Sequence, residues 1–270
     1  MSVDLPIRRV AKPWGCDVLP PPFARDGDER IGEIWFEPPP QLPQLLVKYI
    51  FTSENLSVQV HPSDAQTQAD GLGRQGKEEC WLIVDAQPGA KLGIGFDAPI
   101  DADAMRAAAL DGSIEHLMSW HAVKPGDFFY IPANTVHAIG AGISLIEVQQ
   151  NSDITYRLYD YGRPRELHLD KGIAVASGVP YPDRYRASVP GHGEVTLVSG
   201  PLFRLDRIEG TPSAGMAAHY GEGPFLVVPQ DGEVMVRGEA VAPGSCALVA
   251  AMAELMVPAG AKALLAQAGI

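Results

Sequence analysis

The sequence predicts a mainly β protein, and two observations favour this fold class. The 28 glycines and 24 prolines among 270 residues fall between short apolar runs, a punctuation that is typical of many strands joined by turns. Some of these runs alternate apolar and polar side chains, which indicates strands with two different faces. With 46% hydrophobic and 20% charged residues, the chain has the composition of an ordinary soluble globular protein.

Charge and cysteine content exclude several classes of function. The formal net charge is −12 and no cluster of basic residues occurs, so we expect no nucleic-acid partner. No apolar run approaches the length of a membrane span, and the N-terminus lacks the apolar segment of a signal peptide. The three cysteines (Cys16, Cys80 and Cys246) lack CxxC spacing and indicate free thiols. We therefore expect a cytoplasmic protein with a small-molecule partner, and the sequence does not predict its oligomeric state.

The first part of the chain is expected to consist of strands with one helical region at about residues 101–120. Strands are predicted at residues 30–36, 45–51, 56–61, 81–85, 128–131, 143–150 and 154–159. The run 101–110 differs from them, because Asp101 is a good N-cap, its alanines favour helix, and Asp111-Gly112 ends it. A second short helix is expected at 113–120, and residues 167–176 are expected to form a brief helix or a linker.

The last hundred residues contain further short strands separated by glycine and proline, at 195–198, 203–208, 225–229 and 232–236. The run Ala-Pro-Gly-Ser at 242–245 precedes an apolar strand, as Lys-Pro-Gly-Asp does at 124–127. This repeat indicates an internal duplication of a β unit. Its second copy lacks the His and Glu donors described next, so we expect that copy to be structural.

Polar side chains at three places along the chain predict a metal site. If residues 56–61 form a strand, Gln59 and His61 lie on the same face. A glutamate follows in the run 77–84, where Glu78 and Glu79 would lie on opposite faces of a strand. His137 comes later, at the end of a turn. A glutamine carbonyl, two imidazoles and a carboxylate form a mixed nitrogen and oxygen donor set that suits Zn²⁺ and also accepts Mn²⁺, Fe²⁺ or Co²⁺.

Two kinds of motif in the chain resemble known families. Gly126-Asp127, Ile131-Pro132 and His137 resemble the second signature motif of the cupin superfamily, with Asn134 where many cupins have glycine. The segments QVHPSD, GKEECW, YIPANTVHAIG and IEVQQNSDITYRLYDYGR together resemble the type I mannose-6-phosphate isomerases, specifically their short bacterial members. The likeness runs from about residue 12 to about residue 171 and is diffuse in the C-terminal third.

This resemblance implies a fold and a cofactor. The fold would be a metal-binding cupin, a double-stranded β-helix or jelly roll, at residues 1–175, followed by a degenerate cupin-like β domain at 176–270. The resemblance implies one divalent metal ion, expected to be Zn²⁺. Four residues would bind it: Gln59, His61, Glu79 and His137. The resemblance favours Glu79 over Glu78, because the family places its ligand two residues after a lysine and two before a tryptophan.

The resemblance also implies an activity, the interconversion of mannose 6-phosphate and fructose 6-phosphate through an enediol or enediolate. Glu147 and Lys77 are candidates for the proton-transfer groups, with their individual roles unassigned. A lysine near a divalent cation is expected to have a lowered pKa. Arg157 is expected to stabilise the enediolate or to orient the sugar. We predict that Lys48, Asp153 and Arg163 bind the substrate, and Arg165 is a further cation that could contact its phosphate.

Several alternatives stay open at this point. Lys48 could lie at a sheet edge with its amine in solvent, and Arg157 could belong to a surface salt-bridge network. The same fold and metal could serve another sugar-phosphate isomerase or a cupin oxygenase. A non-catalytic sugar-binding cupin is a third possibility, which the presence of both the donor set and the Lys, Glu and Arg residues disfavours.

Overall fold

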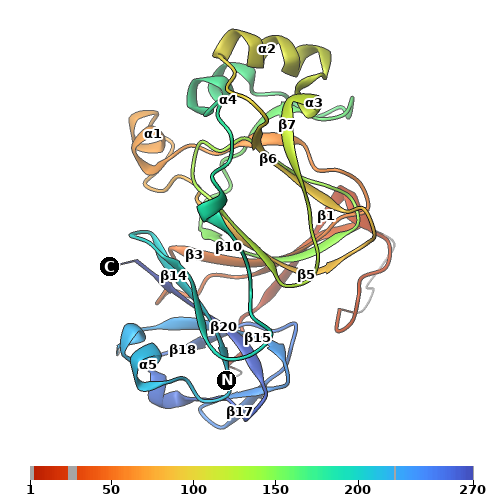
Figure 1. The fold of residues 1–270 in the computed structure, drawn as a ribbon. Coiled ribbons are helices and arrows are strands. Elements are labelled where there is room, and N and C mark those ends of the chain that lie inside the picture. The colour runs from red at the N-terminus through yellow and green to blue at the C-terminus, as the bar shows by residue number, and fades with distance from the viewer. Residues whose placement is uncertain (1–2, 24–28, 222, 270) are drawn as a thin grey trace.

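The strands of the described residues form four antiparallel sheets, which confirms the mainly β fold class (Figure 1). The structure is a computed structural model, and it describes residues 3–23, 29–221 and 223–269. The sheets have seven, five, five and three strands. Within the described residues, no helix is long and apolar enough to cross a membrane.

Two of the sheets enclose the upper part of the molecule in Figure 1, where their strands curve around one another as in a jelly roll. The seven-stranded sheet contains, in spatial order, β1 (Ile7–Cys16), β2 (Ile31–Phe36), β3 (Leu45–Phe51), β10 (Ile143–Gln150), β5 (Glu79–Ala86), β8 (Asp127–Ile131) and β12 (Arg186–Ser188). The five-stranded sheet contains β11 (Tyr156–Tyr159), β4 (Val58–Val60), β9 (His137–Ile139), β6 (Lys91–Phe96) and β7 (Met118–Ala122).

The helices are short, and most lie around this upper unit. They are α1 (Asp64–Ala69), α2 (Ala102–Asp111), α3 (Ile114–Leu117), α4 (Leu169–Val175) and α5 (Ala214–Tyr220), with 3₁₀ turns at Asp183–Tyr185 and Met252–Glu254. The prediction of α2 is confirmed together with its caps, since Asp101 accepts from the Ala104 N–H at 2.8 Å and Gly112 is left-handed. The helix expected at 113–120 is shorter, because residues 118–122 pair with β6 instead.

The C-terminal part forms the remaining two sheets. One contains β13 (Val195–Ser199), β14 (Phe203–Glu209), β20 (Lys262–Ala268), β15 (Phe225–Asp231) and β18 (Ala247–Val249), and the other contains β17 (Glu239–Val241), β16 (Val234–Val236) and β19 (Leu255–Met256). Strand β12 lies after residue 176 in the sequence but pairs with β8 in the first sheet. The division into domains at 175 and 176 stays a prediction.

The seven-stranded sheet separates two apolar cores. On its outer face, side chains such as Tyr49 and Ile146 pack with Leu205 and Leu264 of the C-terminal sheet in one buried cluster. The intervening residues face the interior of the jelly roll, and Trp81 belongs to the core on that side. Because both faces are covered, β3 is buried along its whole length. Polar side chains at inward positions of this sheet are therefore enclosed within the first unit.

Candidate metal centre

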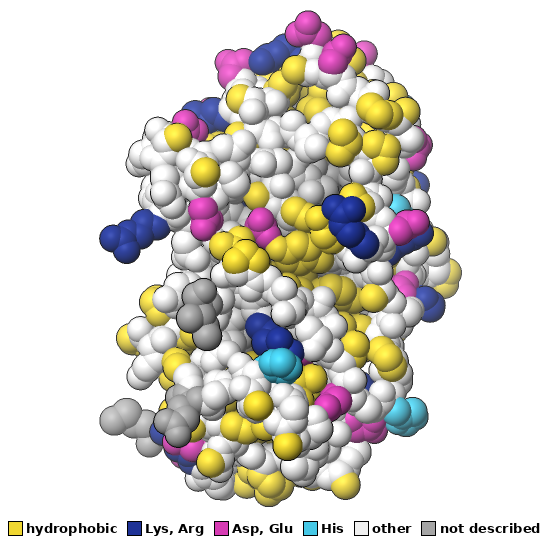
Figure 2. Space-filling model, turned by 60° about the vertical axis from the view of Figure 1, so that its left-hand side comes forward, with side chains coloured by type: hydrophobic (Ala, Val, Ile, Leu, Met, Phe, Trp, Pro, Cys, Tyr) yellow, Lys and Arg dark blue, Asp and Glu magenta, His cyan; other side chains and the backbone are white. Residues whose placement is uncertain are grey.

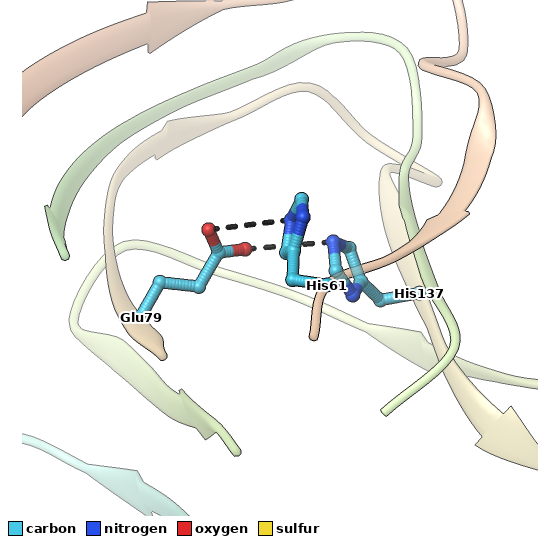
Figure 3. A group of neighbouring side chains, drawn as sticks. All are labelled: His61, Glu79 and His137. Carbon is cyan, nitrogen blue, oxygen red and sulfur yellow. Dashed lines mark ion pairs between the residues drawn. The ribbon is translucent and has the colours of Figure 1, made fainter. Parts of the chain in front are cut away.

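Three buried side chains from different strands point toward one another inside the jelly roll (Figure 3). His61 follows β4, Glu79 is the first residue of β5, and His137 is the first residue of β9. The nitrogen and oxygen atoms that they offer all lie within 4.8 Å of one another. Each residue is at most 1% exposed. Two imidazoles and one carboxylate therefore converge where the sequence predicts a metal site.

Both histidines are held in the tautomer that can bind a metal ion. The Nδ1 atom of His61 lies 2.8 Å from the carbonyl oxygen of Ile154, and that of His137 lies 2.9 Å from the carbonyl oxygen of Thr135. A carbonyl only accepts, so Nδ1 carries the proton and Nε2 keeps its lone pair. Burial lowers the pKa of His61 well below its ordinary value and that of His137 to about 4. Both imidazoles are therefore neutral at pH 7.

The carboxylate of Glu79 completes a set that fits a cation. Its Oε1 atom has no hydrogen-bond donor among the described residues and lies 3.5 Å from Nε2 of His137. Its Oε2 atom lies 3.7 Å from Nε2 of His61. Burial, followed by the neighbouring carboxylate of Glu147, raises the pKa of Glu79 to about 7. Lone pairs that face one another without a proton are costly when buried, and a divalent metal ion among them removes that cost.

Gln59 lies beside this set. It is directly opposite His137 in the ladder between β4 and β9, and its Nε2 is 3.2 Å from Nε2 of that histidine. Its Oε1 accepts a hydrogen bond from the Ser57 hydroxyl at 3.1 Å. The Ser57 hydroxyl can also accept a hydrogen bond. The side-chain amide of Gln59 can therefore be flipped, so that its nitrogen donates to Ser57 and its oxygen faces the histidines. Gln59 as a fourth ligand stays a prediction.

A row of alternating charges continues from the metal centre across the sheet. Nζ of Lys77 contacts Oε2 of Glu79 and lies 3.9 Å from Oε1 of Glu147. Glu147 also accepts from Lys48 at 3.0 Å and from the Trp81 indole at 3.0 Å. Burial alone would raise the pKa of Glu147, but Lys48 and Lys77 outweigh it and lower that pKa to about 2.

The pKa of Lys77 differs from the sequence-based expectation. Burial lowers it, but the carboxylates of Glu147 and Glu79 act more strongly in the opposite direction, and the net pKa is raised. The expectation considered only a neighbouring cation and missed these two acids. With these neighbours Lys77 is an ammonium group at neutral pH, and Glu147 beside it is a carboxylate.

A cavity of about 410 Å³ opens above these residues, and Gln59, Lys77 and Glu147 form part of its wall. The charges that line it are six Lys and Arg side chains against three Asp and Glu side chains: Arg8, Lys12, Lys48, Lys77, Arg157 and Arg165, with Glu33, Glu147 and Asp153. The whole chain has a net charge of −12. On the face in Figure 2, basic side chains lie scattered among acidic ones. The cavity is thus a local region of excess positive charge.

The structure brings two of the three predicted substrate-binding residues to this cavity. Lys48 is 5% exposed and its Nζ lies 4.5 Å over the ring of Trp35, so it is not a sheet-edge lysine. Asp153 also lines the cavity. Arg163 does not line it. Its guanidinium donates to the carbonyl of Asn55 at 2.6 Å and forms part of a separate pocket.

Arg165 takes the position at the cavity that Arg163 was expected to have. The buried carboxylate of Asp160 accepts from both guanidinium groups, at 3.1 Å from Nε of Arg163 and at 2.6 Å from Nε of Arg165. The chain turns just before them, at Tyr161 and Gly162, both of which have positive φ, and Pro164 separates the two arginines. Arg163 lines a pocket with Asn55 and Tyr161, whereas Arg165 lines the cavity.

Sequence reasoning missed several residues of the cavity wall. Arg8 and Lys12 line it from β1, and their spacing, with Val10 and Trp14 also in the wall, is the period of a strand. His168 lines it as well, and its Nδ1 accepts from the Arg157 N–H at 3.2 Å. Outside the cavity wall, Asn134 occupies the position where many cupins have glycine. Its φ of 71° is the left-handed backbone conformation that glycine permits.

Comparison with known proteins shows that the chain is similar to mannose-6-phosphate isomerases. No family model matches it. The chain is 38% identical to a mannose-6-phosphate isomerase of Bacillus subtilis over 74% of this chain and 65% of that relative. The curated relatives that it matches are covered over 50% to 65% of their own lengths, so over less than two thirds.

Solved structures extend the likeness of the fold to nearly the whole chain. A crystal structure of the mannose 6-phosphate isomerase of Bacillus subtilis superposes with a TM-score of 0.78 at 24% identity, and 98% of each chain is covered. A zinc-bound mannose 6-phosphate isomerase superposes with a TM-score of 0.72 at 14% identity over 99% of each chain.

The fold is a cupin-type jelly roll that encloses a candidate metal centre. The chain is similar to mannose-6-phosphate isomerases, and the resemblance that its four motifs predict is confirmed.

Proposed function

We propose that this chain is a metal-dependent aldose–ketose isomerase that interconverts mannose 6-phosphate and fructose 6-phosphate. The observation that carries the proposal is the position of Lys77 and Glu147, which adjoin the His61, Glu79 and His137 set and line one cavity. The relatedness to mannose-6-phosphate isomerases supports the choice of substrate.

The reaction requires a proton to move between C1 and C2 of the open sugar. Glu147 is ionised at neutral pH, because its two lysine neighbours lower its pKa to about 2, and it can accept a proton. Lys77 is protonated at Nζ and can donate one. His61 and His137 take no part as bases, since their free nitrogens face the metal position. A bound divalent ion would supply a positive charge that polarises the sugar oxygens.

The remaining cations of the cavity suit the phosphate end of the substrate. An excess of positive charge in an acidic protein attracts an anion locally. We assign Lys48 and Asp153 to substrate binding as predicted, and Arg165 in place of Arg163. Arg157, next to Gln59 in the sheet, is placed to orient the sugar or to stabilise the enediolate.

We propose Zn²⁺ as the bound ion, with Gln59, His61, Glu79 and His137 as its ligands. Mixed nitrogen and oxygen donor sets suit zinc, and the chain shares its fold with a zinc-bound isomerase. A cytoplasmic location is also part of the proposal, supported by three cysteines that form no disulfide.

A coupled assay tests this proposal. Protein stripped of metal and reloaded with Zn²⁺ is supplied with mannose 6-phosphate, and fructose 6-phosphate is detected through a downstream dehydrogenase. We expect turnover with the phosphorylated sugar and none with Glu79→Gln, which removes a metal ligand. Folded, zinc-loaded protein that forms no fructose 6-phosphate would overturn the proposal. Oxygen consumption by iron-loaded protein would instead identify a cupin oxygenase.

A further inference from the structure

The motif QVHPSD extends beyond the metal-site histidine to an aspartate that lies outside the cavity wall. Oδ1 of Asp64 accepts two hydrogen bonds, from the backbone N–H of Gly76 at 2.7 Å and from the side-chain amide of Gln150 at 2.9 Å. Gly76 opens the motif GKEECW, and Gln150 belongs to IEVQQN. One carboxylate oxygen therefore joins three of the four motifs that define the family resemblance.

The backbone around Lys77 is fixed by these contacts. The N–H of Gly76 bonds to Asp64, the N–H of Lys77 donates to the carbonyl of Pro62 at 3.0 Å, and the N–H of Glu78 donates to Oε1 of Gln150 at 3.0 Å. Strand β5 begins only at Glu79. These three consecutive backbone N–H groups precede the strand, so no neighbouring strand supplies their acceptors. Residues of the other motifs accept their hydrogen bonds instead.

Gly76 permits this close approach. A Cβ atom on Gly76 would lie 2.3 Å from the carbonyl oxygen of Pro62, which is well inside van der Waals contact. Residues 71–74, which precede this point, are exposed. The loop therefore approaches the site from solvent, and it becomes buried at Gly76, where Asp64 and Pro62 contact it.

We infer that Asp64 is a positioning residue for Lys77. Through Gly76 and Gln150 it fixes the backbone that aims Nζ of Lys77 at Glu79 and Glu147. Asp64 does not line the cavity, so it acts through Lys77 and does not contact the substrate. The inference rests on the proposed function, in which Lys77 transfers a proton.

Three variants test the inference in the zinc-loaded, full-length protein. Asp64→Ala removes the acceptor, whereas Asp64→Asn keeps an oxygen that accepts both hydrogen bonds. Asp101→Ala is the matched control, because Asp101 likewise accepts from a backbone N–H, at 2.8 Å, but at the start of α2 and away from the cavity. We expect Asp64→Ala to lower kcat by about tenfold or more with little change in KM, since small misplacements of catalytic groups slow the chemical step strongly.

Asp64→Asn is expected to recover most of that kcat, and Asp101→Ala to leave it unchanged. Each variant should keep one zinc ion per chain. The inference is overturned if Asp64→Ala keeps wild-type kcat, if it loses zinc in parallel with activity, or if Asp64→Asn is as slow as Asp64→Ala. If Asp64→Ala does not fold, Gln150→Met removes the second link, and normal kcat in that variant likewise overturns the inference.

Amide hydrogen exchange separates this inference from the proposed function. In Asp64→Ala the N–H groups of Gly76, Lys77 and Glu78 should exchange faster, while those at the centre of β5 stay protected. Unchanged exchange at these three amides overturns the positioning role even if the isomerase assay succeeds. An inactive wild-type protein would overturn the proposed function while the exchange measurement still reports on Asp64.

Discussion

Arg157 lies directly opposite Gln59 in the ladder between β11 and β4, and Gln59 lies opposite His137 of β9. Directly opposed side chains share a face of the sheet, with Cβ atoms about 4.5–5.5 Å apart. The guanidinium of Arg157 therefore starts from the side of the sheet that faces the metal centre, and it lines the cavity. In the described part of the chain its guanidinium has no hydrogen bond or ion pair. It is available to a ligand.

Arg157→Ala should abolish most turnover without loss of metal. Removal of a charge that stabilises an enediolate is expected to lower kcat by about 10²–10³-fold, whereas the metal ligands are untouched. Steady-state kinetics with mannose 6-phosphate and zinc analysis of the same samples measure both quantities. Arg163→Ala is the matched control, because that arginine lies outside the cavity. Near-normal kcat in Arg157→Ala would return this residue to the salt-bridge interpretation.

Alternation along strands was sufficient to predict much of the candidate site. Gln59 and His61 share a face because they are two residues apart at a strand, and the same rule separates Glu79 from Glu78 and Cys80. In the structure Glu79 faces the two histidines, whereas Cys80 lies in the core on the opposite side of the sheet. A strand has only two faces, so alternation predicts which side chains lie together, whereas the choice of Glu79 over Glu78 came from the family resemblance.

Features that depend on turns were beyond this reasoning. Arg163 and Arg165 are two residues apart, yet only Arg165 lines the cavity, because the segment after the turn at Tyr161 and Gly162 is a loop, in which the alternation of a strand does not hold. Helix α1 lacks the apolar periodicity by which a sequence predicts a helix, and a capping box between Ser63 and Gln66 stabilises it. The short motifs predict which residues carry the chemistry. They do not predict the cavity, because its walls are formed by strands that are far apart in the sequence.

Removal of the metal ion should inactivate and destabilise the protein reversibly. A ligand at a hundredfold excess over its Kd adds about 2.7 kcal/mol to the free energy of unfolding, so zinc should raise the thermal midpoint measurably. His137→Ala is expected to fold but to bind no stoichiometric zinc, whereas His192→Ala, an exposed histidine, should bind it normally. Isomerase activity that survives exhaustive chelation would contradict the role of the metal.

In the metal-free protein, the buried histidines should contribute less to stability as the pH falls from about 7 to 4. The pKa of His137 falls from 6.5 to about 4 on folding, chiefly because of burial, so in this window the unfolded chain binds a proton that the folded one does not. This contribution is constant above pH 6.5, decreases as the pH falls, and amounts to about 3 kcal/mol at most.

Glu79 acts in the opposite direction, because its pKa is raised from 4.5 to about 7 and the folded state binds its proton more tightly. A comparison of chelated wild type with His137→Gln isolates the histidine, since Glu79 is present in both. Urea unfolding at a series of pH values should show a wild-type advantage that shrinks between pH 6.5 and 4. A difference that does not change with pH would mean that His137 is protonated equally in both states.

The C-terminal sheet should stabilise the first unit by covering its outer face. Leu264 of β20 is fully buried in the cluster that includes Tyr49 and Ile146 of the seven-stranded sheet. Leu264→Ala is expected to lower the free energy of unfolding by about 2–5 kcal/mol, because it removes buried methyl groups and leaves a cavity. Leu110→Ala is the control, since Leu110 is 67% exposed in α2 and its loss should cost within about 0.5 kcal/mol.

Measurement of kcat in Leu264→Ala and Leu110→Ala shows whether the C-terminal sheet only covers the first unit or also regulates the site. Lys48 and Glu147 lie on the inner face of the same strands, so a covering role predicts that kcat of folded Leu264→Ala equals that of the wild type at a temperature well below its unfolding transition. Urea denaturation gives the stability difference, and the isomerase assay gives kcat from the same preparations. A folded Leu264→Ala protein with altered kcat and normal zinc content would show that contacts of the C-terminal sheet control the site through β3 and β10.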